Sequence, residues 1–482
     1  SPTRATILTG RHPFRHGIGT PAGANLPETE FTLPEAFDAA ASGYGLFSIG
    51  KWHLGGGVDG ARTRGGWPAF AGTAGNLTDY WAWDKITDGT TAPVTDTYAT
   101  TDQVNDALDF IRDQPAGTPW FCWVGFHAPH TPIHVPPSGL LPAGTSPPAS
   151  NRDRFEQMLE ALDTEIGRLL RDVDLAETNV LLVGDNGTPN NLLQPPFSNG
   201  HGKGTLYEGG TRVTLVAAGP DVPARGTNDN PVQVADLYPT ILSLAGIDVS
   251  QVAPPSTIID GRDLYPALAG SQVSGYAVSE IFGNGVTAPG RAIREGDFKL
   301  LILDDPADSL DTPSFELYNV FNDPDEQNEL LGQAGGPTAG QQEAYQALLA
   351  KNQALGGGFG DLPGQDHSVT LSFQLQSPNE QGQNVPPLIN TNNGNIVRPR
   401  GITVGGAAAT WDESINGTGT AASRIDATGA PDRFWITFDF DPVAAGFDQA
   451  GRQGPHPVTV SFPGAGGTAR IYRAVSSYTY SP

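Results

Sequence analysis

Four short, continuous apolar runs constrain the fold of this chain more than any other feature of its sequence. Each run ends close to Gly, Asp or His, and the four are GYGLFSIG (43–50), PWFCWVGFH (119–127), NVLLVGDN (179–186) and TRVTLVAAG (211–219). Apolar runs of this length are typical of strands that are buried on both faces of a sheet. We therefore expect these runs to form the strands of one sheet.

Helical patterns separate the apolar runs. Apolar side chains recur at helical spacing in residues 152–173, and a second helical pattern in residues 234–247 stops at Gly246. Strands that alternate with helices indicate an α/β fold, with a mostly parallel central sheet sandwiched by helices. Ligand sites in such folds lie beyond the carboxyl ends of the strands, where the polar residues described below occur.

The pattern changes after residue 274, which we expect to end the α/β domain (1–274). Residues 275–355 contain YAVSEIF, RAIREGDFKLLIL and FELYNV, followed by a helical segment. They predict a C-terminal subdomain with a small antiparallel sheet and a helix. A Gly-rich linker follows at 356–366. Alternating runs such as SVTLSFQLQ and RFWITFDFD predict a β-rich appended tail at 367–482, whose role the sequence does not indicate.

The charge balance excludes two classes of partner. The chain has 52 Asp and Glu against 27 Lys and Arg, which gives a formal net charge of −25 at pH 7. A chain this negative repels nucleic acid and anionic membrane surfaces. It also contains no run of about 18 apolar residues, so we expect no membrane span. The oligomeric state is left open.

Basic residues stand in short motifs at the ends of the expected strands. They are Arg4, Lys51, His53, His127, His130 and Lys203. A single Lys or His has an ordinary explanation, either as a solvated surface residue or as a side chain with a local hydrogen bond. Together, these residues would form a cationic pocket at one edge of the sheet, suited to a tetrahedral oxyanion such as sulfate or phosphate.

Asp185 and Asn186 directly follow the third apolar run. They would present a carboxylate and an amide oxygen from neighbouring backbone positions. Hard cations such as Ca²⁺ or Mg²⁺ prefer oxygen ligands, although two ligands fall short of the roughly six to eight that Ca²⁺ takes. An Asp-Asn-Gly sequence is also typical of a plain turn.

Taken in order, these motifs resemble the type I (formylglycine-dependent) sulfatases, a branch of the alkaline phosphatase superfamily. The segment SPTRATILTGR (1–11) is similar to their active-site signature, in which Cys or Ser, any residue, Pro, a small residue and Arg precede Thr-Gly-Arg. GYGLFSIGKWHLGG is similar to their second signature, and FHAPHTPIHVPP, VGDNGT, GKGTLYEGGTR and FELYNVFNDPDEQNEL have counterparts in the same order. The likeness covers residues 1 to about 355 and leaves out the tail.

The resemblance implies an arylsulfatase-like sulfuric ester hydrolase. Its nucleophile is a formylglycine, whose hydrated form attacks sulfur, expels the alcohol and then eliminates the covalent sulfate. Arg4 is expected to orient the formylglycine, Lys51 to bridge it and a sulfate oxygen, and His53 to act as the base.

The remaining roles that the resemblance implies concern the leaving group and the metal. His130 and Lys203 are expected to hold the sulfate and to protonate the leaving oxygen. Asp185 and Asn186 would be half of a Ca²⁺ site, with Mg²⁺ as the alternative ion. His127 matches no family position, so we expect it to be structural or to lie on the pocket rim.

The signature places the nucleophile two residues before Pro2, and therefore one position before Ser1. The first strand of the family and its pair of Asp ligands would lie further upstream. We therefore expect an N-terminally truncated stretch of a longer sulfatase, which is inactive when the chain starts at Ser1.

Three functions remain open on the sequence. The first is a sulfatase that acts on a sulfated small molecule or polysaccharide, with the periplasmic or extracellular location that the resemblance implies. The second is a phosphonate or phosphodiester hydrolase that shares the formylglycine signature. The third is a non-catalytic protein that binds an anion or, through its tail, a glycan.

Overall fold

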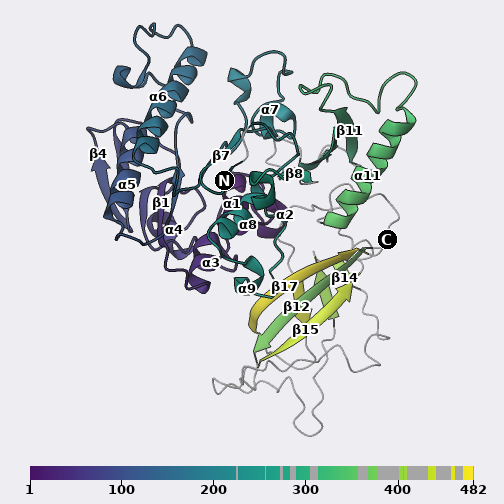
Figure 1. Ribbon diagram of the computed structural model, residues 1–482. Coiled ribbons are helices and arrows are strands. Elements are labelled where there is room, and N and C mark those ends of the chain that lie inside the picture. The colour runs from purple at the N-terminus through teal and green to yellow at the C-terminus, as the bar shows by residue number, and fades with distance from the viewer. Residues whose placement is uncertain are drawn as a thin grey trace. The chain divides into compact units, whose positions relative to one another are not determined.

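The structure is a computed structural model (Figure 1) that describes residues 1–223, 226–255, 257–271, 275–282, 289–303 and 313–356 in full, and the backbone of six strands beyond them. The chain divides into two compact units. One contains Ser1–Leu303 and Phe315–Leu348, and the other contains Asp304–Ser314 and Leu349–Pro482. The α/β part and the small antiparallel sheet therefore belong largely to the first unit. The predicted domain boundaries stay predictions.

The central sheet of the first unit has five strands in the order β4-β3-β2-β1-β5. β1 (Gly45–Lys51) runs parallel to both β2 (Phe70–Thr73) and β5 (Trp120–Gly125). β3 (Trp83–Thr87) and β4 (Thr90–Val94) add an antiparallel hairpin beside β2. The predicted α/β fold with a mostly parallel central sheet is confirmed.

The last two apolar runs pair with each other. β6 (Val180–Val183) and β7 (Leu215–Ala218) form an antiparallel two-stranded sheet among the described strands. The expectation that all four runs lie buried in one sheet was therefore wrong for these two. The paired side chains of Leu182 and Val216 are 42% and 50% exposed, and β5 is partly exposed along most of its length because it is the edge strand of its sheet.

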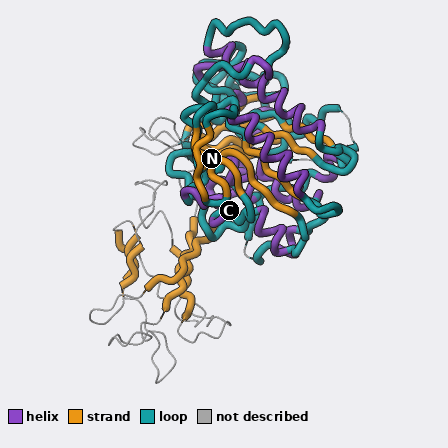
Figure 2. Tube along the Cα trace, turned by 90° about the vertical axis from the view of Figure 1, so that its left-hand side faces the viewer, coloured by secondary structure: helices purple, strands orange, loops and turns teal. Residues whose placement is uncertain are grey.

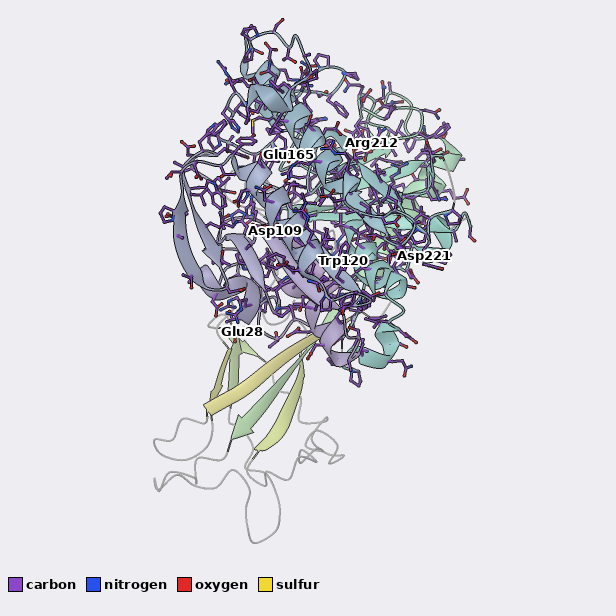
Figure 3. The ribbon with its side chains drawn as sticks, turned by 60° about the vertical axis from the view of Figure 1, so that its left-hand side comes forward. Glu28, Asp109, Trp120, Glu165, Arg212 and Asp221 are labelled. Carbon is purple, nitrogen blue, oxygen red and sulfur yellow. The ribbon has the colours of Figure 1, made fainter. Side chains whose placement is uncertain are left out.

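Helices pack against the strands of the first unit (Figure 2). The long helices α5 (Ala99–Asp113) and α6 (Asn151–Arg171) contact each other. Glu165 of α6 is buried between them, where its Oε1 accepts a hydrogen bond from Thr101 Oγ1 at 2.6 Å and its Oε2 pairs with Arg168 Nε at 2.6 Å (Figure 3). This ion pair with a hydrogen bond compensates for the burial of the carboxylate.

The predicted helix at 152–173 is confirmed as α6, although its buried face differs in detail. A capping box of Ser150 and Asp153 fixes its start. The buried positions include Phe155 and Met158, whereas Leu159 is 41% exposed. The apolar stripe therefore follows the side that faces α5 and leaves part of the predicted apolar set in solvent.

Shorter helices complete the first unit. They are α1 (Pro2–Thr9), α2 (Pro13–His16), α3 (Leu33–Ala39), α4 (Gly60–Thr63), α7 (Glu208–Thr211), α8 (Leu237–Leu244), α9 (Val249–Val252) and α10 (Tyr265–Leu268). Most of α1 is buried in the hydrophobic core of the first unit. The predicted stop after α8 is confirmed, since Gly246 has a φ of 73°.

The predicted small antiparallel sheet is confirmed, with strand order β11-β10-β9-β8. Its strands are β8 (Tyr276–Ile281), β9 (Gly290–Glu295), β10 (Phe298–Leu303) and β11 (Ser314–Asn319), and the predicted helix is α11 (Ala339–Leu355). Glu280 of β8 and Arg291 of β9 form an ion pair at 2.6 Å in which both side chains are 0% exposed. Glu280 also accepts the backbone N–H of Phe14 at 2.9 Å, which attaches the sheet to α2.

Replacing Arg291 by Met should lower the free energy of unfolding by about 3–5 kcal/mol, because the carboxylate of Glu280 stays buried without its cation. Urea unfolding followed by circular dichroism measures this change. Arg294→Met is the matched control, since Arg294 lies 3.9 Å from Glu208 and is 27% exposed, and its loss should change stability by about 1 kcal/mol or less. Equal effects of the two substitutions would contradict the account.

Three strands of the tail form where the sequence predicted them, namely β12 (His367–Gln376), β15 (Arg433–Phe440) and β16 (Val458–Ser461). The strands β13 (Gly401–Val404), β14 (Ala407–Ala409) and β17 (Arg470–Tyr480) were not predicted. β12 pairs antiparallel with β15 and β17, and β13 pairs with β14 and β16. The predicted linker lies outside the described residues, apart from Gly356. In the described residues, no helix is long and apolar enough to cross a membrane.

Candidate functional site

Three parallel strands bring candidate residues to one edge of the central sheet. β1 ends at Lys51, which pairs with Thr73 at the end of β2, and Gly50 pairs with Gly125 at the end of β5. His53 follows β1 by two residues and His130 follows β5 by five. Because parallel strands share their carboxyl edge, the loops that carry Lys51, His53 and His130 begin at the same edge.

Arg4 reaches this edge from α1. It is 7% exposed, and its Nη1 donates a hydrogen bond of 2.6 Å to the backbone carbonyl of Lys51. A Cβ atom at Gly125 would lie 2.5 Å from the same Nη1, so the end of β5 has room for the guanidinium only because residue 125 is glycine. Arg4 is thus fixed against the end of β1.

The loops that carry Asp185 and Lys203 are each held by hydrogen bonds. Thr3 Oγ1 donates to the backbone carbonyl of Asp185 at 2.6 Å, which ties the loop after β6 to the signature helix. The backbone N–H of Lys203 donates to Thr188 O at 2.8 Å. Asn190 holds the same turn, since its Oδ1 accepts the N–H of Gly202 at 2.7 Å and its Nδ2 donates to the carbonyl of Lys203 at 3.4 Å.

The charges of the candidate basic residues act on one another. Burial lowers the pKa of Lys51 to about 8, with smaller contributions from Arg4 and Lys203 that also lower it and from Asp185 that raises it. Burial, followed by the charges of Lys51, the N-terminal ammonium of Ser1, Arg4 and His130, lowers the pKa of His53 to about 4. Each of these charged side chains therefore lies within electrostatic range of Lys51 or His53.

The two candidate catalytic histidines differ in their hydrogen bonds. His53 has a φ of 57°, and its buried Nδ1 has no hydrogen-bond partner in the described part of the chain. His130 Nδ1 lies 3.0 Å from the carbonyl of Thr131. Because a carbonyl only accepts, Nδ1 carries the proton and Nε2 is the nitrogen that remains for a ligand. Burial also lowers the pKa of His130.

His127 is structural rather than part of the pocket surface. It is 4% exposed, and burial lowers its pKa to about 3. Gln103 Nε2 lies 2.8 Å from His127 Nδ1, and Thr73 Oγ1 lies 2.8 Å from His127 Nε2. With both ring nitrogens bonded to protein groups, His127 links α5 to the end of β2.

The sequence did not identify the residues that hold the candidate side chains in place. Tyr80 is 2% exposed and donates its hydroxyl to the carbonyl of His130 at 2.9 Å. Tyr80 thus fixes the loop that carries His130, and Asn190 fixes the turn that carries Lys203. Neither residue is marked by a motif, because each acts on a loop that only the folded chain brings close.

The described residues provide only part of a metal site. Asp185 and Asn186 carry oxygen donors of the kind that Ca²⁺ prefers. No cluster of three or more His, Cys, Asp or Glu that could hold a metal occurs in the described ranges. Two oxygen donors do not complete a Ca²⁺ shell, so the metal assignment stays a prediction and no chemical step below depends on it.

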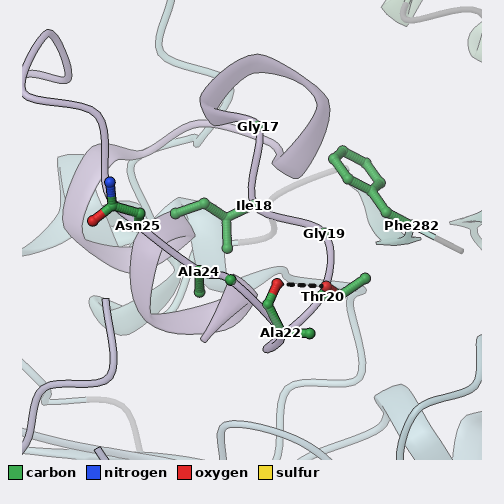
Figure 4. Close-up of a pocket in the computed structure, with 9 residues that line it drawn as sticks. Gly17, Ile18, Gly19, Thr20, Ala22, Ala24, Asn25 and Phe282 are labelled. Atoms are coloured by element: carbon green, nitrogen blue, oxygen red, sulfur yellow. Dashed lines mark hydrogen bonds between the residues drawn. The ribbon is translucent and has the colours of Figure 1, made fainter. Parts of the chain in front are cut away.

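Figure 4 shows a small hollow that none of the candidate basic residues lines. It is lined by the loop Gly17–Asn25 and by Phe282, and its volume is about 100 Å³. Thr20 Oγ1 donates to Ala22 O at 3.2 Å along its wall. The hollow has room for a few water molecules but is well below the usual size of a small-molecule site.

A protein-family model matches the part of the chain that contains the candidate residues. The family model described as Sulfatase matches residues 1–247, which contain every candidate residue above. The chain belongs to the sulfatase family. The resemblance expected from the sequence is thereby confirmed at the level of the family.

Curated relatives of this sulfatase-family chain are themselves named sulfatases. N-acetylgalactosamine-6-sulfatase of Canis lupus familiaris is 31% identical over 321 residues, which cover 57% of this chain and 58% of that protein. Arylsulfatase A of Homo sapiens is 29% identical over 405 residues, which cover 72% of this chain and 76% of that protein. The chain thus spans less than two thirds of the length of the first of these relatives.

Solved structures share the fold of this sulfatase-family chain. The crystal structure of Ps i-CgsB matches with a TM-score of 0.58 and 22% identity, over 73% of this chain and 80% of that chain. The structure of BT4656 in complex with its substrate D-glucosamine-2-N,6-O-disulfate matches with a TM-score of 0.57 and 21% identity, over 73% of this chain and 87% of that chain. At this identity the matches support the fold alone.

Proposed function

We propose that the protein is a sulfuric ester hydrolase that releases inorganic sulfate from a sulfated carbohydrate. The observation that carries the proposal is the convergence of Arg4, Lys51 and Lys203 beside the signature helix, in a chain whose net charge is −25. Concentrated positive charge on so acidic a protein is costly unless an anion binds there. The family match makes sulfate the anion that fits best.

Lys51 and Lys203 would hold the sulfate group of the ester. Lys51 is 8% exposed, and its ammonium is partly desolvated, so its interaction with an anion is stronger than that of a surface lysine. Its backbone is fixed by Arg4 and that of Lys203 by Asn190. The sulfate would therefore bind to groups whose positions are set before it arrives.

His53 would act as the base. The formylglycine expected one position before Ser1 would supply the nucleophile. Because the pKa of His53 is about 4, its imidazole is neutral at pH 7 and has a nitrogen free to take a proton. Its buried Nδ1, which has no partner in the described residues, is suited to this task.

His130 and Lys203 would supply the proton to the leaving oxygen. His130 Nδ1–H is engaged by the carbonyl of Thr131, so its Nε2 faces the ester. The charge of a bound sulfate ester favours the protonated imidazole, which then donates from Nε2. Lys203 would share the developing charge on the leaving oxygen.

The carbohydrate class of the substrate is proposed from the relatives. One relative is named for N-acetylgalactosamine 6-sulfate, and BT4656 was solved with a disulfated glucosamine. Ps i-CgsB was solved with a neocarrahexaose. We also propose that Asp185 and Asn186 bind Ca²⁺. The location that we propose is periplasmic or extracellular, where sulfated glycans occur.

The test uses the protein with the coding sequence that precedes Ser1 in its gene, so that the nucleophile position is filled. We expect release of inorganic sulfate from 4-nitrophenyl sulfate and from monosulfated sugars, at rates well above those on bis(4-nitrophenyl) phosphate. Faster hydrolysis of the phosphodiester would support the phosphodiesterase alternative. Absence of turnover on all three substrates would contradict the proposed activity and leave an anion-binding protein.

A further inference from the structure

An exposed tryptophan lies beside the loop that carries His130. Trp81 is 43% exposed, although the residue before it, Tyr80, is 2% exposed and Trp83 is 7% exposed. Its ring therefore presents apolar surface that a ligand could remove from water.

Trp81 is held in place from several sides. Asp79 Oδ1 accepts the backbone N–H of Trp81 at 2.6 Å and that of Ala82 at 3.2 Å. Its indole packs on the ring of Tyr98, with 5.1 Å between the ring centroids. The carbonyl of Tyr80 also accepts the N–H of Ala99 at the start of α5, at 2.9 Å. A ring fixed in this way loses little conformational entropy when a ligand covers it.

The position of Trp81 is on the His130 side of the pocket. Tyr80, its neighbour in the chain, donates its hydroxyl to the carbonyl of His130 at 2.9 Å. Tyr98, on which the indole packs, lies 2.9 Å from His134 Nε2, and His134 Nδ1 donates to Pro132 O at 2.8 Å. Both neighbours of Trp81, Tyr80 in the chain and Tyr98 in its ring contact, are thus bonded to the loop 130–134.

This side of the pocket is where the alcohol part of an ester would lie. Lys51 and Lys203 would hold the sulfate, and His130 would face the oxygen that leaves with the alcohol. The group attached to that oxygen therefore extends past His130 toward Trp81. The loop of Trp81 begins at the carboxyl end of β2, which is the sheet edge that carries the basic residues.

We propose that the exposed face of Trp81 binds the pyranose ring that bears the sulfate ester, and this inference rests on the proposed sulfatase function. One face of a pyranose is rich in C–H groups, and it stacks on an indole because apolar surface is removed from water. The carboxylate of Asp79 is exposed next to it and accepts hydrogen bonds from ring hydroxyls. The same charge repels a second sulfate, so the subsite takes a sugar that is otherwise neutral.

The proposal is tested by calorimetric titration of residues 1–482 with the 6-sulfates of galactose, N-acetylgalactosamine and glucosamine, and with inorganic sulfate. We expect at least one sugar sulfate to bind more tightly than inorganic sulfate. Trp81→Ala should weaken that sugar by about tenfold and leave the affinity for inorganic sulfate unchanged. Trp81→Phe should retain most of the affinity, because it keeps an aromatic face.

Phe321→Ala is the matched control, since Phe321 is 71% exposed and has no place in the site. It should leave every affinity unchanged, and circular dichroism checks that each variant is folded. Equal affinity of Trp81→Ala and the unmodified chain for the sugar sulfates overturns the proposal. So does a protein that binds no sugar sulfate more tightly than inorganic sulfate. The two proposals fail in different ways. If the proposed function is wrong, sulfate release is absent while Trp81→Ala still weakens the binding of the sugar sulfate.

Discussion

Replacing Lys51 by Met should lower kcat/KM for a sulfate ester by about 10³-fold, the loss expected when a fixed charge that faces the transition state is removed. Lys51 is 8% exposed and its carbonyl is held by Arg4, so no mobile surface lysine can take its place. Initial rates of sulfate release measure the effect. The loss should appear in kcat as well as in KM, because charge on the ester oxygens grows in the transition state.

Lys85→Met is the matched control for this substitution. Lys85 lies 2.7 Å from both Asp102 and Asp106, and its role is to hold α5 to the β3–β4 hairpin. Its loss should leave kcat/KM within about twofold of the unmodified enzyme. A similar loss at both lysines would show that the effect of Lys51 is a general loss of positive charge.

The second large effect is on the pH profile. The pKa of His53 is about 4 and that of Lys51 is about 8. As the pH rises through about 4, His53 loses its proton and becomes able to act as a base, so kcat/KM should rise. His130, whose pKa burial lowers, is already neutral at pH 7 in the free enzyme, so Lys203 is the donor to the leaving oxygen that remains in this range. As the pH rises further through about 8, Lys51 loses the charge that holds the sulfate, so kcat/KM should fall by about tenfold per pH unit.

Lys51→Arg separates the two limbs of this profile. A guanidinium stays charged throughout the range, so the alkaline limb should move above pH 9 while the acid limb stays at about 4. Rates between pH 3 and 10 provide the measurement. An alkaline limb that remains at about 8 in Lys51→Arg would assign that limb to another group and contradict the proposed role of Lys51.

The sequence was sufficient for the elements whose signal is local. The apolar run of β1, the helical pattern of α6 and the strands β8 to β11 all form where the sequence predicts them. The β3–β4 hairpin was missed although its signal is present. Asp88 and Gly89 join its strands with φ values of 47° and 84°, and an Asp-Gly pair between strands is a strong sign of a tight hairpin turn.

The pairing of strands was beyond the sequence. β6 and β7 are apolar runs like β1, and nothing in either run indicates that they pair antiparallel with each other. Pairing and burial both depend on which segments the rest of the chain brings together, and Leu182 and Val216 are exposed although their runs are apolar.

In the candidate site, the sequence identified the residues that lie in motifs but not the residues that hold their loops in place. Arg4, Lys51, His53, His130 and Lys203 were found because each lies in a short motif, and the structure brings them to one edge of the sheet. Tyr80 and Asn190 were not found, because their hydrogen bonds cross 50 and 13 residues of sequence. Residues that position a loop carry no local pattern of their own.

The central claim is that Lys51 and Lys203 belong to one anion pocket at the carboxyl edge of the central sheet. Calorimetric titration of residues 1–482 with sodium sulfate at pH 7 tests it most directly, with the double variant Lys51→Met/Lys203→Met and the control Lys85→Met. We predict one sulfate site in the unmodified chain and in the control, and none in the double variant. Sulfate binding of equal affinity in all three proteins would contradict the claim.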